Sequence, residues 1–436
     1  MDWKDYQTLK DNYGSRVAEV ASRVGELEIQ ARFYAGEFGL AWTGADGEMI
    51  EAIHLGEWNR EPGPDFVRAK LRIDGVEKSG DIELDPEDAD WERHGHATNP
   101  AFDHVILHVF LRSSRRRFFT RNSRNHLIAQ VGLKPVSPQD RRNRPPPSSA
   151  GTVAQEEAVA LVDAAARFRL GRKREAWLRS EALHGRDEAI FQGLAVGLGY
   201  KNNKVPFLLV SQRTTLARAR KSDGEALLFG IAGFLDSRPF DEAGQPARQY
   251  LRDLWERWWK MRDREARLVL PSTAWTVAAT RPQNHPHRRL AALAAAARRM
   301  PGIIAGVRAA DAAAFLGILE GLEHEFFDSH ASLTSAPFAH PCALVGHQRA
   351  VELAANLLAP AAGLEAGMEI LRALRAGTPS SRAVKSAAWL GLTGEASRQL
   401  LATALGQQGL IQLYDDFFPA PAGDLFAAIA SGGAGR

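Results

Sequence analysis

The chain has 436 residues, of which 45% are hydrophobic and 25% are charged, which is typical of a globular protein and unlike a disordered one. The net charge is only +3, and the single cysteine, Cys342, excludes an internal disulfide framework and a multi-cysteine zinc site. The first residues form no apolar signal segment, and no apolar run is long enough to span a membrane, so we expect a cytoplasmic protein with no membrane partner.

The first third of the chain alternates between helical and strand patterns. Apolar residues at helical spacing predict a helix over 16–34. Shorter periods and turn residues such as Asp74-Gly75 then predict strands over 40–43, 49–53, 66–73, 80–84 and 104–111. A short helix is expected within 86–102, before the last of these strands. The predicted order is therefore helix, strand meander, helix, strand.

A proline-rich segment separates this part from a region of different character. Residues 135–154 contain several prolines and cannot form a regular helix or a central strand, so we interpret them as a linker. Beyond the linker, Ala, Leu and Arg recur at helical spacing. The sequence thus predicts an α+β domain over 1–134 and an all-helical domain over 155–436.

Carboxylates gather where two of the predicted strands begin and end. Asp65 precedes one strand, and Asp81, Glu83 and Asp85 alternate along the next, so the last three share a face. Like charges on one face repel unless a cation neutralises them, and oxygen ligands suit Mg²⁺ or Mn²⁺. We expect Asp65, Glu83 and Asp85 to bind such a metal; the alternative is that they are turn residues and the solvated face of an edge strand.

Four histidines follow the acidic strand within fifteen residues. His94 and His96 come directly after the carboxylates, and His104 and His108 lie on the next predicted strand at a spacing that shares one face. Single histidines are usually structural, but this grouping makes His94 and His96 candidates for a general acid or base.

Short blocks of sequence resemble an uncharacterised bacterial family, domain of unknown function 2851. The blocks of the first part are Gly56-Glu57-Trp58-Asn59, Gly63-Pro64-Asp65-Phe66, Gly80-Asp81-Ile82-Glu83 and His94-Gly95-His96. Those of the helical part include 197–203, 228–233 and 281–289, so the resemblance covers most of the chain. Two features depart from it: Asp85 stands where histidine is common, and a cysteine-rich C-terminal end is missing.

The first part also resembles the PD-(D/E)xK nuclease superfamily, which implies a restriction-endonuclease-like αβββαβ core. The resemblance implies that Pro64-Asp65 is the "PD" motif, that Glu83 is the second acid and that Glu26 or Glu28 is the helix glutamate. Asp85 occupies the position of the motif lysine, which ordinarily orients or activates the attacking water. Either Lys70, His94 or His96 takes that role, or the fold is a retired nuclease.

A basic run follows the last predicted strand. Its arginines are interleaved with Phe118-Phe119 and are suited to holding phosphates while an aromatic ring stacks on a base. The expected nucleic-acid-binding residues are Arg112, Arg115, Arg116, Arg117 and Arg121. The alternative is a solvated hairpin tip.

These expectations combine into a metal-dependent nuclease that cleaves DNA or RNA. The catalytic candidates are Asp65, Glu83, Asp85, His94, His96, Lys70 and Glu28. The helical domain would then position the nucleic acid or recruit a protein partner. The alternative is a module that keeps the nuclease-like sheet and binds nucleic acid or protein without turnover; the sequence leaves the oligomeric state open.

Overall fold

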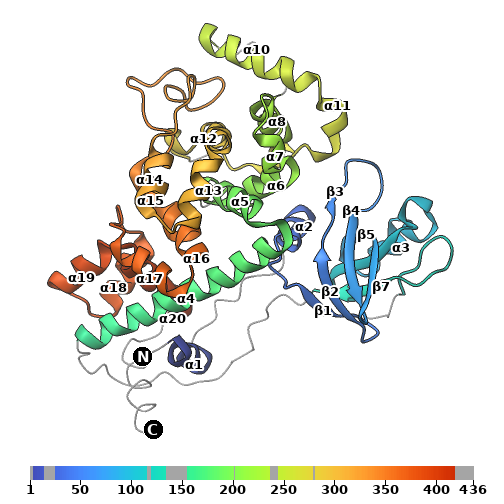
Figure 1. Cartoon of the computed structure of the whole chain (residues 1–436), viewed down its shortest axis with the longest axis horizontal. Coiled ribbons are helices and arrows are strands. Elements are labelled where there is room, and N and C mark those ends of the chain that lie inside the picture. The colour runs from blue at the N-terminus through green and yellow to red at the C-terminus, as the bar shows by residue number, and fades with distance from the viewer. Residues whose placement is uncertain are drawn as a thin grey trace.

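The computed structural model describes residues 3–13, 25–114, 119–133, 155–200, 202–235, 244–277 and 280–417. An N-terminal sheet lies beside a larger helical region, and helix α2 lies between the two (Figure 1). Helix α3 covers the sheet from its other side. The predicted linker, 135–154, lies outside the described residues.

The sheet has seven strands, in the order β1-β2-β4-β5-β6-β7 with β3 paired to β4. Their bounds are β1 (Ala41–Thr43), β2 (Met49–His54), β3 (Glu57–Trp58), β4 (Phe66–Ile73), β5 (Val76–Glu87), β6 (Val105–Arg112) and β7 (Ala129–Gly132). The pairs from β1 through β5 are antiparallel, whereas β6 runs parallel to both β5 and β7. The hairpin predicted over 40–53 and the strand over 66–73 are confirmed.

The structure corrects the predicted length of β5. It was expected to end at Leu84, but it continues through Asp85-Pro86 to Glu87. Its pairing with β4 ends at Ile82, and beyond that point it pairs with β6 alone. Because one side of β5 is then unpaired, a proline that lacks an N–H group is tolerated there.

Three short helical segments replace the single helix expected within 86–102. They are α3 (Asp90–Arg93), followed by the 3₁₀ turns His96–Thr98 and Pro100–Phe102. Gly95 separates them with a φ of 76°, a conformation that glycine adopts without strain. The helix predicted over 16–34 is described from Glu26 to Tyr34 (α2), since 14–24 lie outside the described residues.

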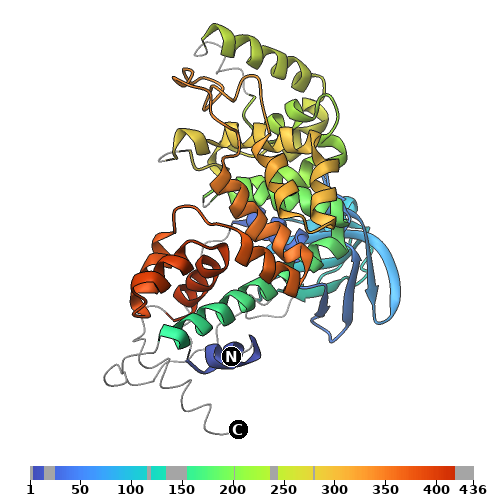
Figure 2. The same ribbon diagram turned by 60° about the vertical axis from the view of Figure 1, so that its left-hand side comes forward.

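The helical region forms the rest of the chain (Figure 2). Its longer helices are α4 (Gln155–His184), α5 (Arg186–Leu198), α6 (Lys204–Thr214), α8 (Gly224–Ile231), α10 (Gln245–Trp259), α12 (Pro286–Arg298), α13 (Met300–Arg308), α14 (Ala312–Glu320), α17 (Leu364–Ala373), α18 (Ser381–Trp389), α19 (Gly394–Leu401) and α20 (Ala404–Phe417). Shorter ones are α7 (Leu216–Ala219), α11 (Arg262–Glu265), α15 (His347–Leu353), a π-helical turn η7 (Ala354–Leu358) and α16 (Ala359–Ala362).

Helix α13 begins at residues that usually favour the end of a helix. Pro301 and Gly302 look like helix breakers, but Pro301 lies in the first turn of α13, where its missing N–H has no intrahelical partner anyway. By length and composition, no single described helix could cross a membrane; the bent pair α12 and α13 passes that test only together, with an angle of 74°.

Helix α2 joins the sheet to the helical region. Its buried residues include Ile29 and Phe33, which belong to a hydrophobic core that continues into the helices. Gln212 of α6 donates a hydrogen bond to the carbonyl oxygen of Ala31 at 3.0 Å. Nε2 of His184 on α4 lies 2.7 Å from the carbonyl oxygen of Tyr34. The sheet is therefore held against the helices by both apolar packing and hydrogen bonds.

Helix α1 (Trp3–Tyr13) packs on the helical region although it precedes the sheet in sequence. The Tyr6 hydroxyl donates to Asp416 of α20 at 3.1 Å, and Lys10 forms an ion pair with the same carboxylate at 3.0 Å. The first residues of the predicted α+β domain thus contact α4 and α20.

Candidate functional site

Strand β5 places two carboxylates in the interior. Glu83 and Asp85 are buried, with 7% and 2% of their surface exposed, and alternation puts both on one face of the strand. Ile82 and Leu84 point to the opposite face and join the main core. The packing of these apolar neighbours fixes the register that buries the acids.

Asp65 lies beside Glu83 through two reciprocal hydrogen bonds. The Asp65 N–H donates to Oε2 of Glu83 at 2.9 Å, and the Leu84 N–H donates to Oδ2 of Asp65 at 3.1 Å. These bonds join the residue that precedes β4 to strand β5. They bring together two acids that are 18 positions apart in the sequence.

The turn at Gly95 directs His94 and His96 toward the acids. Nδ1 of His94 lies 3.2 Å from Oδ1 of Asp85, and Nε2 of His96 lies 3.2 Å from Oε1 of Glu83. The two imidazole ring centres are 5.4 Å apart, and His96 also stacks on Phe102 at 4.0 Å. This stacking orients the His96 ring.

His108 of β6 is the last member of the group and contacts Asp85. Its Nε2 lies 3.3 Å from Oδ2 of Asp85, and its Nδ1 lies 2.7 Å from the Thr120 hydroxyl oxygen. The parallel register pairs His108 with Glu83, and the side chain is fully buried. We call Asp65, Glu83, Asp85, His94, His96 and His108 the acid–histidine centre.

Burial and mutual repulsion set the charges of this centre. Burial, then the charge of Glu83, holds the pKa of Asp65 well above its usual range. Burial, then the charge of Asp85, does the same for the pKa of Glu83. Burial lowers the pKa of His96. The protein on its own thus disfavours ionisation here, and a bound cation would reverse that preference.

One group in the described part of the chain has the geometry of a metal site. Ligand atoms of Asp85, His94 and His96 all lie within 4.8 Å of one another. Oδ2 of Asp85 and Nε2 of His96 and His108 are buried and lie within 3.3 Å of an opposite polar group, but none of them makes a well-aligned hydrogen bond. Buried polar atoms without partners are rare, and a cation would satisfy them. One carboxylate with two imidazoles suits Mn²⁺, Zn²⁺ or Fe²⁺ better than Mg²⁺, which prefers oxygen ligands.

Three charged residues outside the sheet also act electrostatically on the centre, and the sequence selected only one of them, Glu26, as one of two candidates for the helix glutamate. Burial, then the charge of Asp85, raises the pKa of Glu26 in the first turn of α2. Arg213 of α6 and Arg267 act on Asp65 and Glu83 respectively, and Arg267 lowers the pKa of Glu83 against the larger effect of burial. No local pattern marks these two arginines, because they lie far along the chain from the sheet.

Two of the predicted catalytic residues lie elsewhere. Lys70 is exposed on β4, where its Nζ forms an ion pair with Glu77 at 2.6 Å. Oε1 of Glu28 lies 3.7 Å from Nη1 of Arg32 on the same helix, whereas the charge of Asp85 acts on Glu26. Neither Lys70 nor Glu28 is among the residues that the acid–histidine centre brings together.

The predicted phosphate-binding arginines are only partly described. Arg112 binds Glu87 at 3.1 Å, and Arg121 donates to Asn125 at 3.2 Å. Both side chains lie at the surface, and the Arg121 carbonyl accepts a hydrogen bond from the Trp91 indole at 2.9 Å. Arg115, Arg116 and Arg117 lie outside the described residues.

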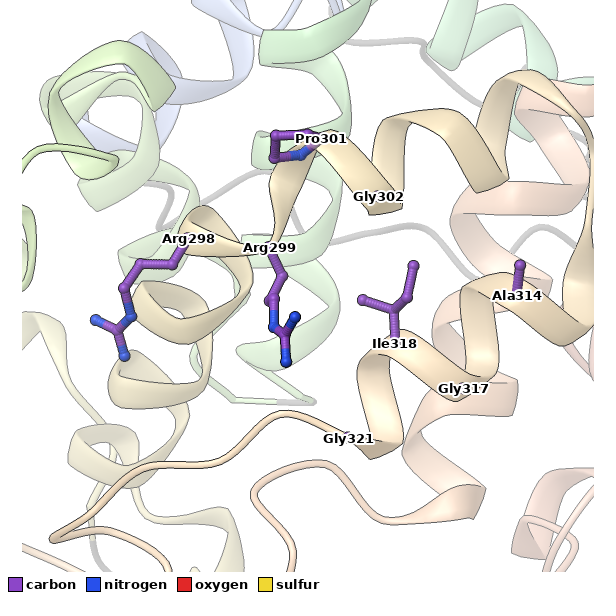
Figure 3. A pocket seen from close by; sticks show the side chains of 8 residues that line it. All are labelled: Arg298, Arg299, Pro301, Gly302, Ala314, Gly317, Ile318 and Gly321. Atoms are coloured by element: carbon purple, nitrogen blue, oxygen red, sulfur yellow. The ribbon is translucent and has the colours of Figure 1, made fainter.

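A cavity of about 580 Å³ lies between α13 and α14. Figure 3 shows Arg298 and Arg299 beside it, and glycines with Pro301, Ala314 and Ile318 complete its lining. It contains no acid, no histidine and none of the predicted site residues. The acid–histidine centre thus remains the better candidate for chemistry.

Comparison with known proteins gives a family. The family described as "Protein of unknown function (DUF2851)" matches residues 39–368, well over half of the chain. That range includes the whole acid–histidine centre. No curated protein and no solved structure matches the chain. The chain belongs to the DUF2851 family.

Proposed function

We propose that the chain is a metal-dependent phosphodiesterase that hydrolyses the backbone of DNA or RNA. The observation that carries the proposal is the acid–histidine centre, where ligand atoms of Asp85, His94 and His96 lie within 4.8 Å of one another and buried atoms of Asp85 and His96 lack a well-aligned hydrogen bond. Asp85, His94 and His96 would hold the cation. When bound, a divalent cation polarises a phosphoryl oxygen and activates water.

The arrangement of elements supports a nuclease-like core. Helix α2 with Glu26 precedes the antiparallel strands β2, β4 and β5, and α3 then leads to the parallel strand β6. This is the order of helix, meander, helix and strand that the PD-(D/E)xK resemblance implies, with Asp65 and Glu83 at its two acidic positions.

The protein's own groups would perform the remaining steps. Glu83 contacts His96 and, once ionised, can accept a proton from the attacking water. Asp85 in the lysine position cannot stabilise the negative charge that develops on the phosphate, so that role would fall to the cation.

Cleavage assays test the proposal. Full-length protein is incubated with Mn²⁺ or Mg²⁺ and with single-stranded DNA, duplex DNA or RNA. We expect cleavage that is greater with Mn²⁺ and that is lost in Asp85→Asn and Glu83→Gln. The exposed His104, which lies outside the metal-ligand group, gives the control His104→Ala, which should keep the activity. Cleavage unchanged in Asp85→Asn would contradict the proposal.

A second function is favoured by one observation: Asp85 occupies the position of the motif lysine. A chain that keeps the sheet without turnover would bind nucleic acid or protein only. In that case, the wild type and Glu83→Gln would bind nucleic acid equally, and neither would cleave it with either metal.

A further inference from the structure

A group of positively charged residues lies on and around helix α4, and none of them belongs to the acid–histidine centre. It crosses the helical region and packs along α20 and α16 (Figures 1 and 2). Arg169 and Lys173 are four residues apart, so they lie on the same face of α4. Lys204 begins α6, Arg349 lies on α15 and Arg382 lies on α18. We call these five residues the α4 basic cluster.

Neutral amides hold the two α4 cations in place. Nζ of Lys173 donates to Oδ1 of Asn356 at 2.5 Å and to Oε1 of Gln408 at 2.6 Å. Arg169 donates to Gln408 at 2.9 Å and to Gln412 at 3.0 Å. Amide oxygens fix the direction of these cations without cancelling their charge. Asn356 lies in the π-helical turn η7, a distortion that is frequent at functional sites.

The cations lie close to one another: Arg169 and Lys173 both donate to Gln408, and Arg169 and Arg382 both pair with Asp415. Burial, followed by the charges of Arg169 and Lys204, lowers the pKa of Lys173 well below its usual range. Burial, followed by Arg169, Arg349 and Arg382, lowers the pKa of Lys204. The guanidinium of Arg349 lies over the ring of Tyr200 at 4.2 Å, so an aromatic surface supports one edge of the cluster.

Acids do not balance this charge. Asp415 forms ion pairs with Arg169 at 3.4 Å and with Arg382 at 2.9 Å, and Glu352 pairs with Arg349. Lys173 and Lys204 form no ion pair with a carboxylate in the described ranges. The ammonium group of Lys173 is thus held near the guanidinium groups, Lys204 adds an exposed charge that they repel, and only two carboxylates pair with the cluster, an arrangement that an anion would stabilise.

We propose that the α4 basic cluster binds a phosphate group. Guanidinium forks donate paired hydrogen bonds to phosphate oxygens, and ammonium groups add charge at short range. The phosphate could come from a free phosphate ester or from a nucleic-acid backbone. The site is separate from the metal site, so it does not depend on the proposed hydrolysis.

Thermal unfolding of the full chain in EDTA tests the site without metal or turnover. The probe is inorganic phosphate, compared with chloride at equal ionic strength to remove general salt effects. We expect phosphate to raise the Tm of the wild type in a saturable way. Lys204→Gln should lose most of that rise and should itself raise the Tm in chloride, because it removes a repelling charge. Lys221→Gln, an exposed lysine elsewhere, should behave as the wild type.

A second probe identifies the source of the phosphate. If a short single-stranded DNA raises the Tm of the wild type but not of Lys204→Gln, and phosphate has little effect, the ligand is a nucleic-acid backbone. If phosphate, and not the DNA, raises the Tm of the wild type above that of Lys204→Gln, the ligand is a free phosphate ester. An equal response of the wild type and Lys204→Gln to both probes would overturn the proposal. So would a fall in Tm for both Lys204→Gln and Lys173→Met in chloride, which would mark the lysines as structural.

Discussion

Asp85 is the residue at which the contacts of the acid–histidine centre meet. It touches His94 through one carboxylate oxygen and His108 through the other, and its charge acts on Glu83 and Glu26. Its carboxylate also belongs to the ligand group with His94 and His96, so it is suited to share a cation with those two imidazoles. Loss of this one carboxylate should therefore remove more metal affinity than loss of Asp65.

Glu188 gives a pH-dependent prediction away from the site. Burial raises its pKa to about 6, while the hydrogen bond from the Leu216 N–H acts in the opposite direction. Its folded pKa exceeds its unfolded value, so the stability it contributes is present at low pH and is lost as pH rises through about 6. Glu188→Gln should then raise the free energy of unfolding at pH 8 by about 1 to 2 kcal/mol.

The check is urea unfolding of both proteins at pH 5 and pH 8. The variant should gain stability over the wild type mainly at the higher pH. A gain of the same size at both pH values would contradict a burial effect on the ionised carboxylate.

At the scale of elements, Gly56 allows the chain before β3 to pass close to the backbone of β4. Its φ is 83°, and an added Cβ would lie 2.3 Å from the Val67 carbonyl oxygen. Its own carbonyl accepts a hydrogen bond from the Tyr34 hydroxyl at 2.9 Å, which ties this bend to α2. Gly56→Ala should destabilise the protein by about 2 kcal/mol or more, because backbone strain and steric overlap add.

Gly47 gives the matched control for that measurement. Its φ is 93°, but nothing lies within 4 Å of an added Cβ. Gly47→Ala should therefore show the conformational cost alone, about 1 kcal/mol. Equal losses of unfolding free energy in denaturant melts would contradict the close approach at Gly56.

Sequence patterns predicted the elements whose periodicity is strong. They failed where contacts between elements set the bounds of a strand or helix. Alternation along 66–73 and the Asp74-Gly75 turn were sufficient to predict β4 and its hairpin. The extension of β5 through Pro86 follows its pairing with β6, and the breaks between the short helices of 86–102 occur where His96 packs against Phe102. Such features arise from contacts between elements and leave no local signal.

The acidic half of the site could be selected from sequence, but its charged surroundings could not. Asp65, Glu83, Asp85, His94 and His96 fall within about 30 residues, and the structure brings them together. Arg213 and Arg267 belong to the helical region, and their charges act on Asp65 and Glu83 respectively. They lie far along the chain from these acids, so no local pattern links them.

At the scale of the whole molecule, a continuous core predicts cooperative unfolding. Leu71 of β4 and Leu228 of α8 are both fully buried and belong to the same hydrophobic cluster. Calorimetry should show one main transition that includes the sheet. Leu71→Ala and Leu228→Ala should each lower that same transition by about 2 to 5 kcal/mol. A separate transition affected by Leu71→Ala alone would show that the sheet unfolds independently.

The account as a whole depends on cation binding at the acid–histidine centre. Titration calorimetry of the metal-free protein with Mn²⁺ tests it directly, with no need for a substrate. We expect the wild type and His104→Ala to take up one Mn²⁺ per chain with release of protons, and Asp85→Asn and His94→Ala to take up none. The absence of Mn²⁺ uptake by the folded wild type, or unchanged uptake by Asp85→Asn, would contradict the account.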